Sequence, residues 1–110
     1  MNNDFIITYL KKNWKNSSIE DIQFNLQLKE DTRIKLYDIF EAAYKLGYYK
    51  ETSMEVRRNW SEDDQRFLQD YSHLLNVREA ANILQRSRYA TYQQVKLLGL
   101  KEMINKKKFR

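Results

Sequence analysis

Few side chains in the 110-residue sequence could carry out acid–base, nucleophilic or metal chemistry. There is no cysteine and a single histidine, His73, so neither a thiolate site nor a zinc site of several imidazoles can form. The carboxylates fall mostly at expected helix starts, where capping accounts for them. The two glycines, Gly47 and Gly99, do not form a loop that could hold a nucleotide. We therefore expect no enzyme activity, no metal, no cofactor and no small-molecule substrate.

Basic side chains are concentrated in the second half of the sequence. Between residues 86 and 110, eight Lys and Arg side chains accompany a single acid, Glu102. Such an excess of positive charge is typical of a surface that binds a polyanion, and above all nucleic acid. Charge alone leaves open a solvated basic tail, or a surface for an acidic protein or a membrane.

Composition predicts an all-α fold. The absence of proline and the presence of only two glycines favour helices over strands and tight hairpins. No apolar run approaches the roughly 20 residues of a membrane span, and no signal-peptide pattern opens the chain. We expect a cytoplasmic protein that does not contact the membrane. The abundance of Lys, Asn, Ile and Tyr is typical of AT-rich genomes, such as those of low-GC bacteria, their phages and plasmids.

Three helices are expected in residues 1–50. The first covers residues 4–14, and a short second helix follows the capping residue Ser18 and carries Ile19, Ile22 and Leu26. The third is expected to begin near residue 30 or 31 and to end at Gly47. Residues 51–59 lose the apolar periodicity and are interpreted as a junction.

Three further helices are expected between residues 60 and 100. Ser61 with the acids that follow it marks the first helix start, and Asn76 with Glu79 has the spacing of a capping box. Ser87 is expected to cap the last helix, which ends at Gly99. Residues 101–110 form a basic tail that either adds a helical turn or frays.

An internal repeat suggests two small tri-helical, helix-turn-helix-like units in tandem, at residues 1–50 and 60–100. Five positions of one unit align without gaps on five of the other: Ser18, Ile19, Asp21, Ile22 and Leu26 on Asn76, Val77, Glu79, Ala80 and Leu84. Both units also end in Leu-Gly. A shared design of this kind is the signature of a repeated unit.

The second unit carries a characteristic set of residues at fixed spacing. These are Trp60, Ser61, Glu62, Asp63, Asp64, Phe67, Leu68 and Tyr71, then Asn76, Ala81, Leu84, Arg86, Ser87, Ala90, Leu98, Gly99 and Leu100. The set resembles the Myb/SANT-like helix-turn-helix of bacterial and phage DNA-binding regulators, although the later tryptophans of a full Myb repeat are absent. The resemblance implies a three-helix unit with Trp60, Phe67, Leu68 and Tyr71 in its core.

The last helix of a helix-turn-helix lies in the major groove of DNA, with its first residues at the base edges. Residues placed 100° apart separate a core-facing group from a groove-facing group. The core-facing group is Ala90, Thr91, Gln94, Val95 and Leu98, and the groove-facing group is Tyr89, Tyr92, Gln93 and Lys96. Gln93 suits an adenine edge, and Arg88, at the border of this face, suits a guanine or a phosphate.

Other basic residues are assigned to the DNA backbone. We expect Arg86 and Lys96 to contact phosphates, and Arg57 and Arg58 to do the same, with a minor-groove arm as the alternative. Lys106, Lys107, Lys108 and Arg110 would add affinity that falls with salt, or would form a solvated tail. A structural alternative exists for Arg86, which could pair with Glu79, and for Tyr89 and Tyr92, which could pack on a neighbouring helix.

Two functions therefore compete. The first is sequence-specific binding of double-stranded DNA by a phage, plasmid or bacterial regulator, or by an accessory protein that marks a DNA site. The second is a SANT-like protein-interaction module acting on a transcription or DNA-processing partner. The unit at residues 1–50 would serve as a homodimer interface, as a partner platform rich in aromatic residues, or as a second DNA contact through Lys29, Arg33 and Lys35.

Overall fold

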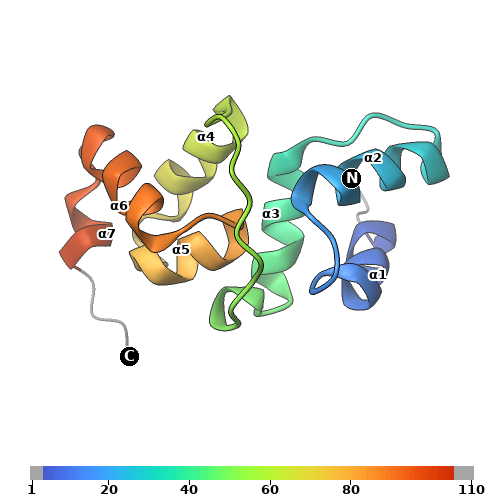
Figure 1. Cartoon of the computed structure of the whole chain (residues 1–110), viewed down its shortest axis with the longest axis horizontal. Helices are drawn as coiled ribbons and strands as arrows, with labels where there is room; N and C mark the ends of the chain where they lie inside the picture. The colour runs from blue at the N-terminus through green and yellow to red at the C-terminus, as the bar shows by residue number, and fades with distance from the viewer. Residues whose placement is uncertain (1–3, 106–110) are drawn as a thin grey trace.

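The protein is all-α, as the sequence predicts. The computed structural model describes residues 4–105, and these residues form helices, turns and irregular segments without a strand (Figure 1). The helices are α1 (Asp4–Asn13), α2 (Ile19–Glu30), α3 (Leu36–Lys45), the 3₁₀ turn η1 (Tyr48–Lys50), α4 (Glu62–Tyr71), α5 (Val77–Leu84), α6 (Arg88–Leu97) and α7 (Lys101–Asn105). Within the described range, no helix is long and apolar enough to cross a bilayer.

Helix α2 is longer than predicted and α3 begins later. Ser18 caps α2 as expected, with its Oγ accepting from the N–H of Asp21 at 3.2 Å. The acids assigned to the start of the third helix instead end α2, because Glu30 is its last residue and Asp31 adopts a left-handed conformation with φ 50°. Asp tolerates that conformation better than most residues, so the break falls there and α3 starts at Leu36.

The predicted helix caps of the second half, and the glycines that end α3 and α6, are confirmed. Ser61 and Asp64 form a capping box at the start of α4, and Asn76 and Glu79 form another at the start of α5. The Ser87 hydroxyl accepts from the N–H of Ala90 and caps α6. Gly47 and Gly99 both have positive φ and follow α3 and α6, as their positions in the sequence predict.

One hydrophobic core runs through both halves. Buried side chains from Ile6 in α1 to Met103 in α7 belong to a single cluster. Helix α3 lies in the middle and packs on α4 (Figure 1), with the Phe40 and Phe67 rings 5.5 Å apart and the rings of Tyr44 and Tyr71 4.9 Å apart. The two halves therefore share one core, and their organisation as two tri-helical units stays a prediction.

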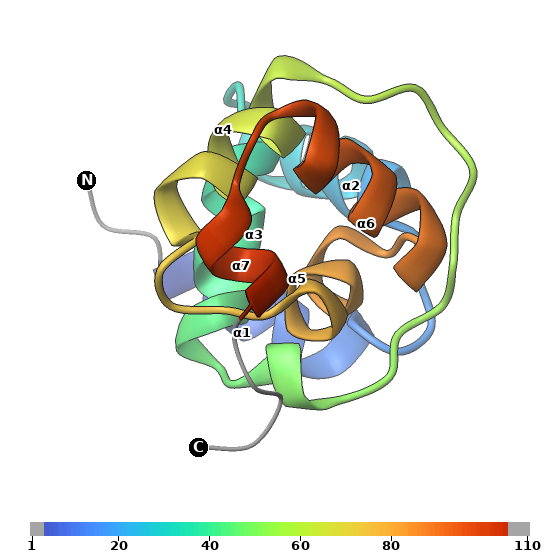
Figure 2. The same ribbon diagram turned by 90° about the vertical axis from the view of Figure 1, so that its left-hand side faces the viewer.

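The segment between η1 and α4, residues 51–61, is called the strap here. It has no regular structure, in agreement with the predicted junction, and it crosses the molecule from η1 to α4 along the outside of α5 and α6 (Figures 1 and 2). The Val56 N–H donates to the Gln85 carbonyl at 2.7 Å, and the Ser53 hydroxyl donates to the Asn82 carbonyl at 2.5 Å. These bonds hold the strap against the end of α5.

Candidate nucleic-acid interface

Helices α5 and α6 are joined by a turn of three residues, Gln85, Arg86 and Ser87. Turns of this length connect the two helices of a helix-turn-helix. Gln85 closes α5 in a left-handed conformation, with φ 56°, where a glycine would be the common choice. Its side chain is fully buried, accepts from the Ile19 N–H at 2.8 Å and donates to the Ser17 carbonyl at 3.1 Å. The turn is therefore tied to the start of α2.

The two faces of α6 are as the helical spacing predicts. Thr91 and Val95 are fully buried, and Ala90, Gln94 and Leu98 are partly covered. The Thr91 hydroxyl donates to the Ser87 carbonyl at 2.9 Å, which explains how a polar residue occupies a core position. The opposite face is exposed and carries Arg88, Tyr89, Tyr92, Gln93, Lys96 and Leu97. Packing by Tyr89 or Tyr92 on a neighbouring helix is not observed, since 73% of Tyr89 is exposed and Tyr92 is also exposed.

The exposed face of α6 carries positive charge that no acid of the same helix balances. Its sequence contains Arg88 and Lys96 but no acid. The Lys96 ammonium lies 5.5 Å from the centre of the Tyr92 ring, so the two side chains cover each other partly without an acidic partner. The exposed tyrosines offer flat surfaces and hydroxyl groups beside the amide of Gln93, and all of these groups can form contacts in a DNA groove.

Arg58 and Arg86 do not lie on this surface, which departs from the phosphate contacts expected for them. Only 6% of Arg86 is exposed, and its guanidinium stacks on the Trp60 ring, 3.8 Å from the ring centre. It donates to the carbonyls of Arg58 and Asn59 at 2.7 and 2.9 Å and to Asp64 Oδ2 at 3.0 Å. The ion-pair partner of Arg86 is Asp64, and not Glu79 as the structural alternative suggested.

Arg58 completes the same buried network. Its Nη1 donates to Asp64 Oδ2 at 2.6 Å, its Nη2 to the Leu84 carbonyl at 2.9 Å, and its Nε lies 2.8 Å from Glu20 Oε2. Arg58 and Arg86 therefore join the strap, α4, α5 and α2. With their charges balanced by Asp64 and Glu20, and with their terminal guanidinium nitrogens bonded, both residues hold the fold together and are not available for the phosphate contacts expected of them.

The electrostatics of this network centre on Asp64. Burial by itself would raise the pKa of the Asp64 carboxyl, but the hydrogen bonds from Arg58 and the Ser61 N–H, with the charges of Arg58 and Arg86, hold it below its usual value. Burial and the adjacent Arg58 charge lower the pKa of Arg86, against the attraction of Asp64. A guanidinium stays protonated at neutral pH, so the network carries its full charges there.

Three other arginines of the second half remain available. Arg57 and Arg88 are exposed and Arg78 is partly exposed, and none of the three has a hydrogen bond or ion pair to any residue in the range 4–105. They lie around two hollows between the strap, α5 and the start of α6. Sequence analysis missed Arg78, although its lack of an acid at the i+4 position indicated that it has no local partner.

The first half presents two different surfaces. Lys29, Arg33 and Lys35 are exposed. The aromatic side chains of α3 and η1 are mostly partly buried against the core, so they are not a free platform. The exposed apolar residues lie instead on α2, where Phe24 and Leu28, one turn apart, are 60% and 67% exposed. The expected tail contacts of Lys106, Lys107, Lys108 and Arg110 lie outside the described residues.

Comparison with known proteins adds no relative. No family model matches the chain, and neither a curated protein nor a solved structure matches it.

Proposed function

We propose that this protein binds double-stranded DNA in a sequence-specific manner, with α6 as the reading helix. Its role would be that of a phage, plasmid or bacterial transcriptional regulator, or of an accessory protein that marks a DNA site. The observation that carries the proposal is the exposed, acid-free face of α6 behind a three-residue turn from α5.

The arrangement of α5, the three-residue turn and α6 supports insertion of α6 into a major groove. The groove, about 12 Å wide, admits one α-helix. Helix α6 packs on α5 and α7 (Figure 2), and its other side, with Tyr89 near the start and Gln93 in the middle, is exposed. The buried Arg86 and Gln85 side chains fix the turn before this helix. A fixed turn reduces the ordering that binding would otherwise require.

A protein-interaction role has one specific observation in its favour. Phe24 and Leu28 on α2 and Leu97 on α6 are large apolar side chains that face solvent, and Leu97 is 81% exposed. Exposed apolar groups are common contacts in protein interfaces. The pair on α2 would serve a homodimer formed through residues 1–50, which would place two α6 helices on a two-fold DNA site. A Myb/SANT-like partner module would use the same side chains without DNA.

Selection from a random pool of short DNA duplexes, followed by sequencing, tests the proposal. We expect the wild-type protein to enrich one sequence motif, and Gln93→Ala to lose preference at one position of it, by about 1–3 kcal/mol if Gln93 makes a bidentate base contact. Asn25→Ala is the matched control, because Asn25 is an exposed amide on α2. No enrichment by the wild-type protein, together with no duplex binding at low salt, would refute the DNA-binding function.

A further inference from the structure

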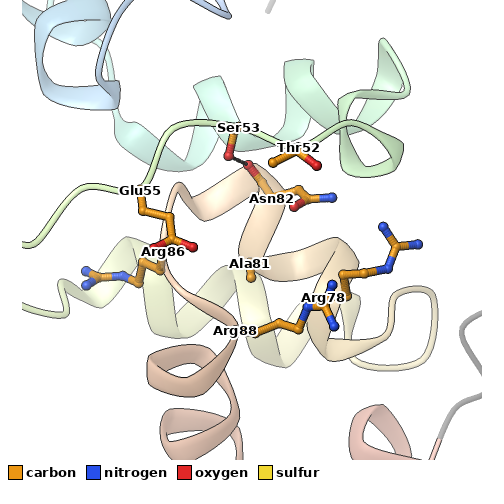
Figure 3. A pocket seen from close by; sticks show the side chains of 8 residues that line it. All are labelled: Thr52, Ser53, Glu55, Arg78, Ala81, Asn82, Arg86 and Arg88. Atoms are coloured by element: carbon orange, nitrogen blue, oxygen red, sulfur yellow. Dashed lines mark hydrogen bonds between the residues drawn. The ribbon is translucent and has the colours of Figure 1, made fainter.

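We infer that the hollow between the strap, α5 and the start of α6 is a binding site for one phosphate of the DNA backbone, held by Arg78 and Arg88. The inference rests on the proposed function and adds to it a backbone contact that Arg78 of α5 shares with Arg88 at the start of the reading helix. The hollow is lined by Thr52, Ser53, Glu55, Arg78, Ala81, Asn82, Arg86 and Arg88 (Figure 3).

The first argument is the state of the arginines. Arg86 points away from Arg78 and Arg88 (Figure 3), and its guanidinium is occupied by Asp64 and two carbonyls. Arg78 and Arg88 have no such partners among residues 4–105. Figure 3 shows the Arg88 side chain extending from the start of α6 towards Arg78 on α5. Two like charges that share a hollow repel each other unless an anion lies between them.

The second argument is the size and polarity of the hollow. Its volume of about 120 Å³ is enough for several water molecules, and hence for a tetrahedral phosphate group. Thr52 adds a hydroxyl from the strap, and the Asn82 amide is held in place by its bond to the Tyr49 carbonyl at 2.9 Å. Arginine donates in a planar fork that fits phosphate oxygens, so two forks on separate helices can bind different oxygens of one group.

The third argument is the position of the hollow relative to α6. It opens beside the first residue of that helix, Arg88. When a recognition helix lies in a major groove, the sugar-phosphate backbone that borders the groove passes its N-terminal end. A phosphate held there fixes the depth and register of the helix without reading sequence. The strap, bound to α5 through Ser53, closes the hollow on the other side.

Glu55 permits a substitution that should raise the affinity for DNA, where loss of Arg78 should lower it. Among residues 4–105 it contributes the one carboxylate that lines this hollow, on the opposite side from Arg78 (Figure 3). A carboxylate near a bound phosphate repels it. Replacing Glu55 by Gln should therefore strengthen DNA binding, whereas replacing Arg78 by Ala should weaken it.

The test measures affinity for the selected duplex between about 50 and about 200 mM salt. For Arg78→Ala we expect the slope of log K against log salt to fall in magnitude by about one, as when one phosphate contact is lost. The loss of affinity should be the same on the selected and on an unrelated duplex, and it should shrink about threefold across this salt range. Lys11→Ala removes an equal charge from an exposed site on α1 and should leave the slope unchanged.

The matched acid variants are Glu55→Gln, expected to bind more tightly, and Glu30→Gln on α2, expected to bind as the wild type. If Arg78→Ala has the same slope as Lys11→Ala and the selected motif is intact, the phosphate site is refuted but the reading helix is not. The phosphate site is also refuted if Arg78→Ala binds the duplex as the wild type does but no longer binds a poly-glutamate peptide. The hollow would then serve an acidic protein. A wild-type protein that binds no duplex refutes the proposed function itself. Urea denaturation of each variant verifies that it is folded.

Discussion

Replacing Asp64 by Asn would leave two buried guanidinium groups without the negative charge that they share. In the wild-type protein, Asp64 Oδ2 lies 2.6 Å from Arg58 Nη1 and 3.0 Å from Arg86 Nη2, and it also accepts from the N–H and hydroxyl of Ser61 at 2.9 Å. Asn keeps the size of the side chain and removes the charge. The substitution therefore isolates the electrostatic part of the network.

The expected loss of stability is large. Removing one partner of a buried ion pair costs about 3–5 kcal/mol, out of a free energy of unfolding of roughly 5–15 kcal/mol for a domain of ordinary size. With a urea m-value of about 1.5 kcal/mol/M, the unfolding midpoint should fall by about 2–3 M. Tryptophan fluorescence follows the transition, since Trp60 stacks directly on Arg86.

Glu62→Gln is the control, because Glu62 is an exposed acid in the first turn of the same helix. It should cost at most about 1 kcal/mol, the usual size of a helix-dipole contribution. Adding Arg86→Met to Asp64→Asn should cost less than the sum of the two single substitutions, because one unpaired charge is removed. If Asp64→Asn shifts the midpoint no further than Glu62→Gln, the buried network does not stabilise the fold and our reasoning about it is wrong.

Four further outcomes follow from the same contacts. Folding lowers the pKa of Asp64, so its contribution to the free energy of unfolding is complete above about pH 4 and is lost as the pH falls through the pKa of the folded state. The urea midpoints of the wild type and of Asp64→Asn should therefore converge in acid. Gln85→Ala should cost about 2–4 kcal/mol in urea denaturation, because it leaves a buried N–H of α2 unpaired and keeps the left-handed conformation. Trp14→Phe and Trp60→Phe proteins should show the same transition by fluorescence and by circular dichroism if the continuous core unfolds as one unit. Tyr89→Ala should change the free energy of unfolding by no more than about 0.5 kcal/mol, since its ring is exposed, while it weakens DNA binding.

The parts of the fold that the sequence predicts correctly are those that depend on local order. The capping boxes at Ser61 and Asn76 and the buried positions Thr91 and Val95 follow from spacing along one helix. The same holds for the exposed positions of α6. These signals need no knowledge of which helix lies against which.

The start of α3 and the roles of two arginines could not be obtained in this way. The segment before α3 is held by side chains of α2, with the Ile34 N–H donating to Gln27 Oε1 at 2.9 Å and Gln23 Nε2 donating to the Ile34 carbonyl at 2.8 Å. Arg58 and Arg86 are basic residues at positions that suit DNA contacts, and only the fold brings them to Asp64. Such long-range pairs leave no periodic trace in the sequence.

The central claim is that the exposed face of α6 contacts DNA, and amide NMR of the labelled protein during titration with the selected duplex tests it most directly. We predict that the largest shifts fall on residues 88–96 and on the side-chain amide of Gln93, with smaller shifts at Arg78 and in the strap. The claim is contradicted if these signals stay in place while those around Phe24 and Leu28 of α2 move, because the first half would then make the contact.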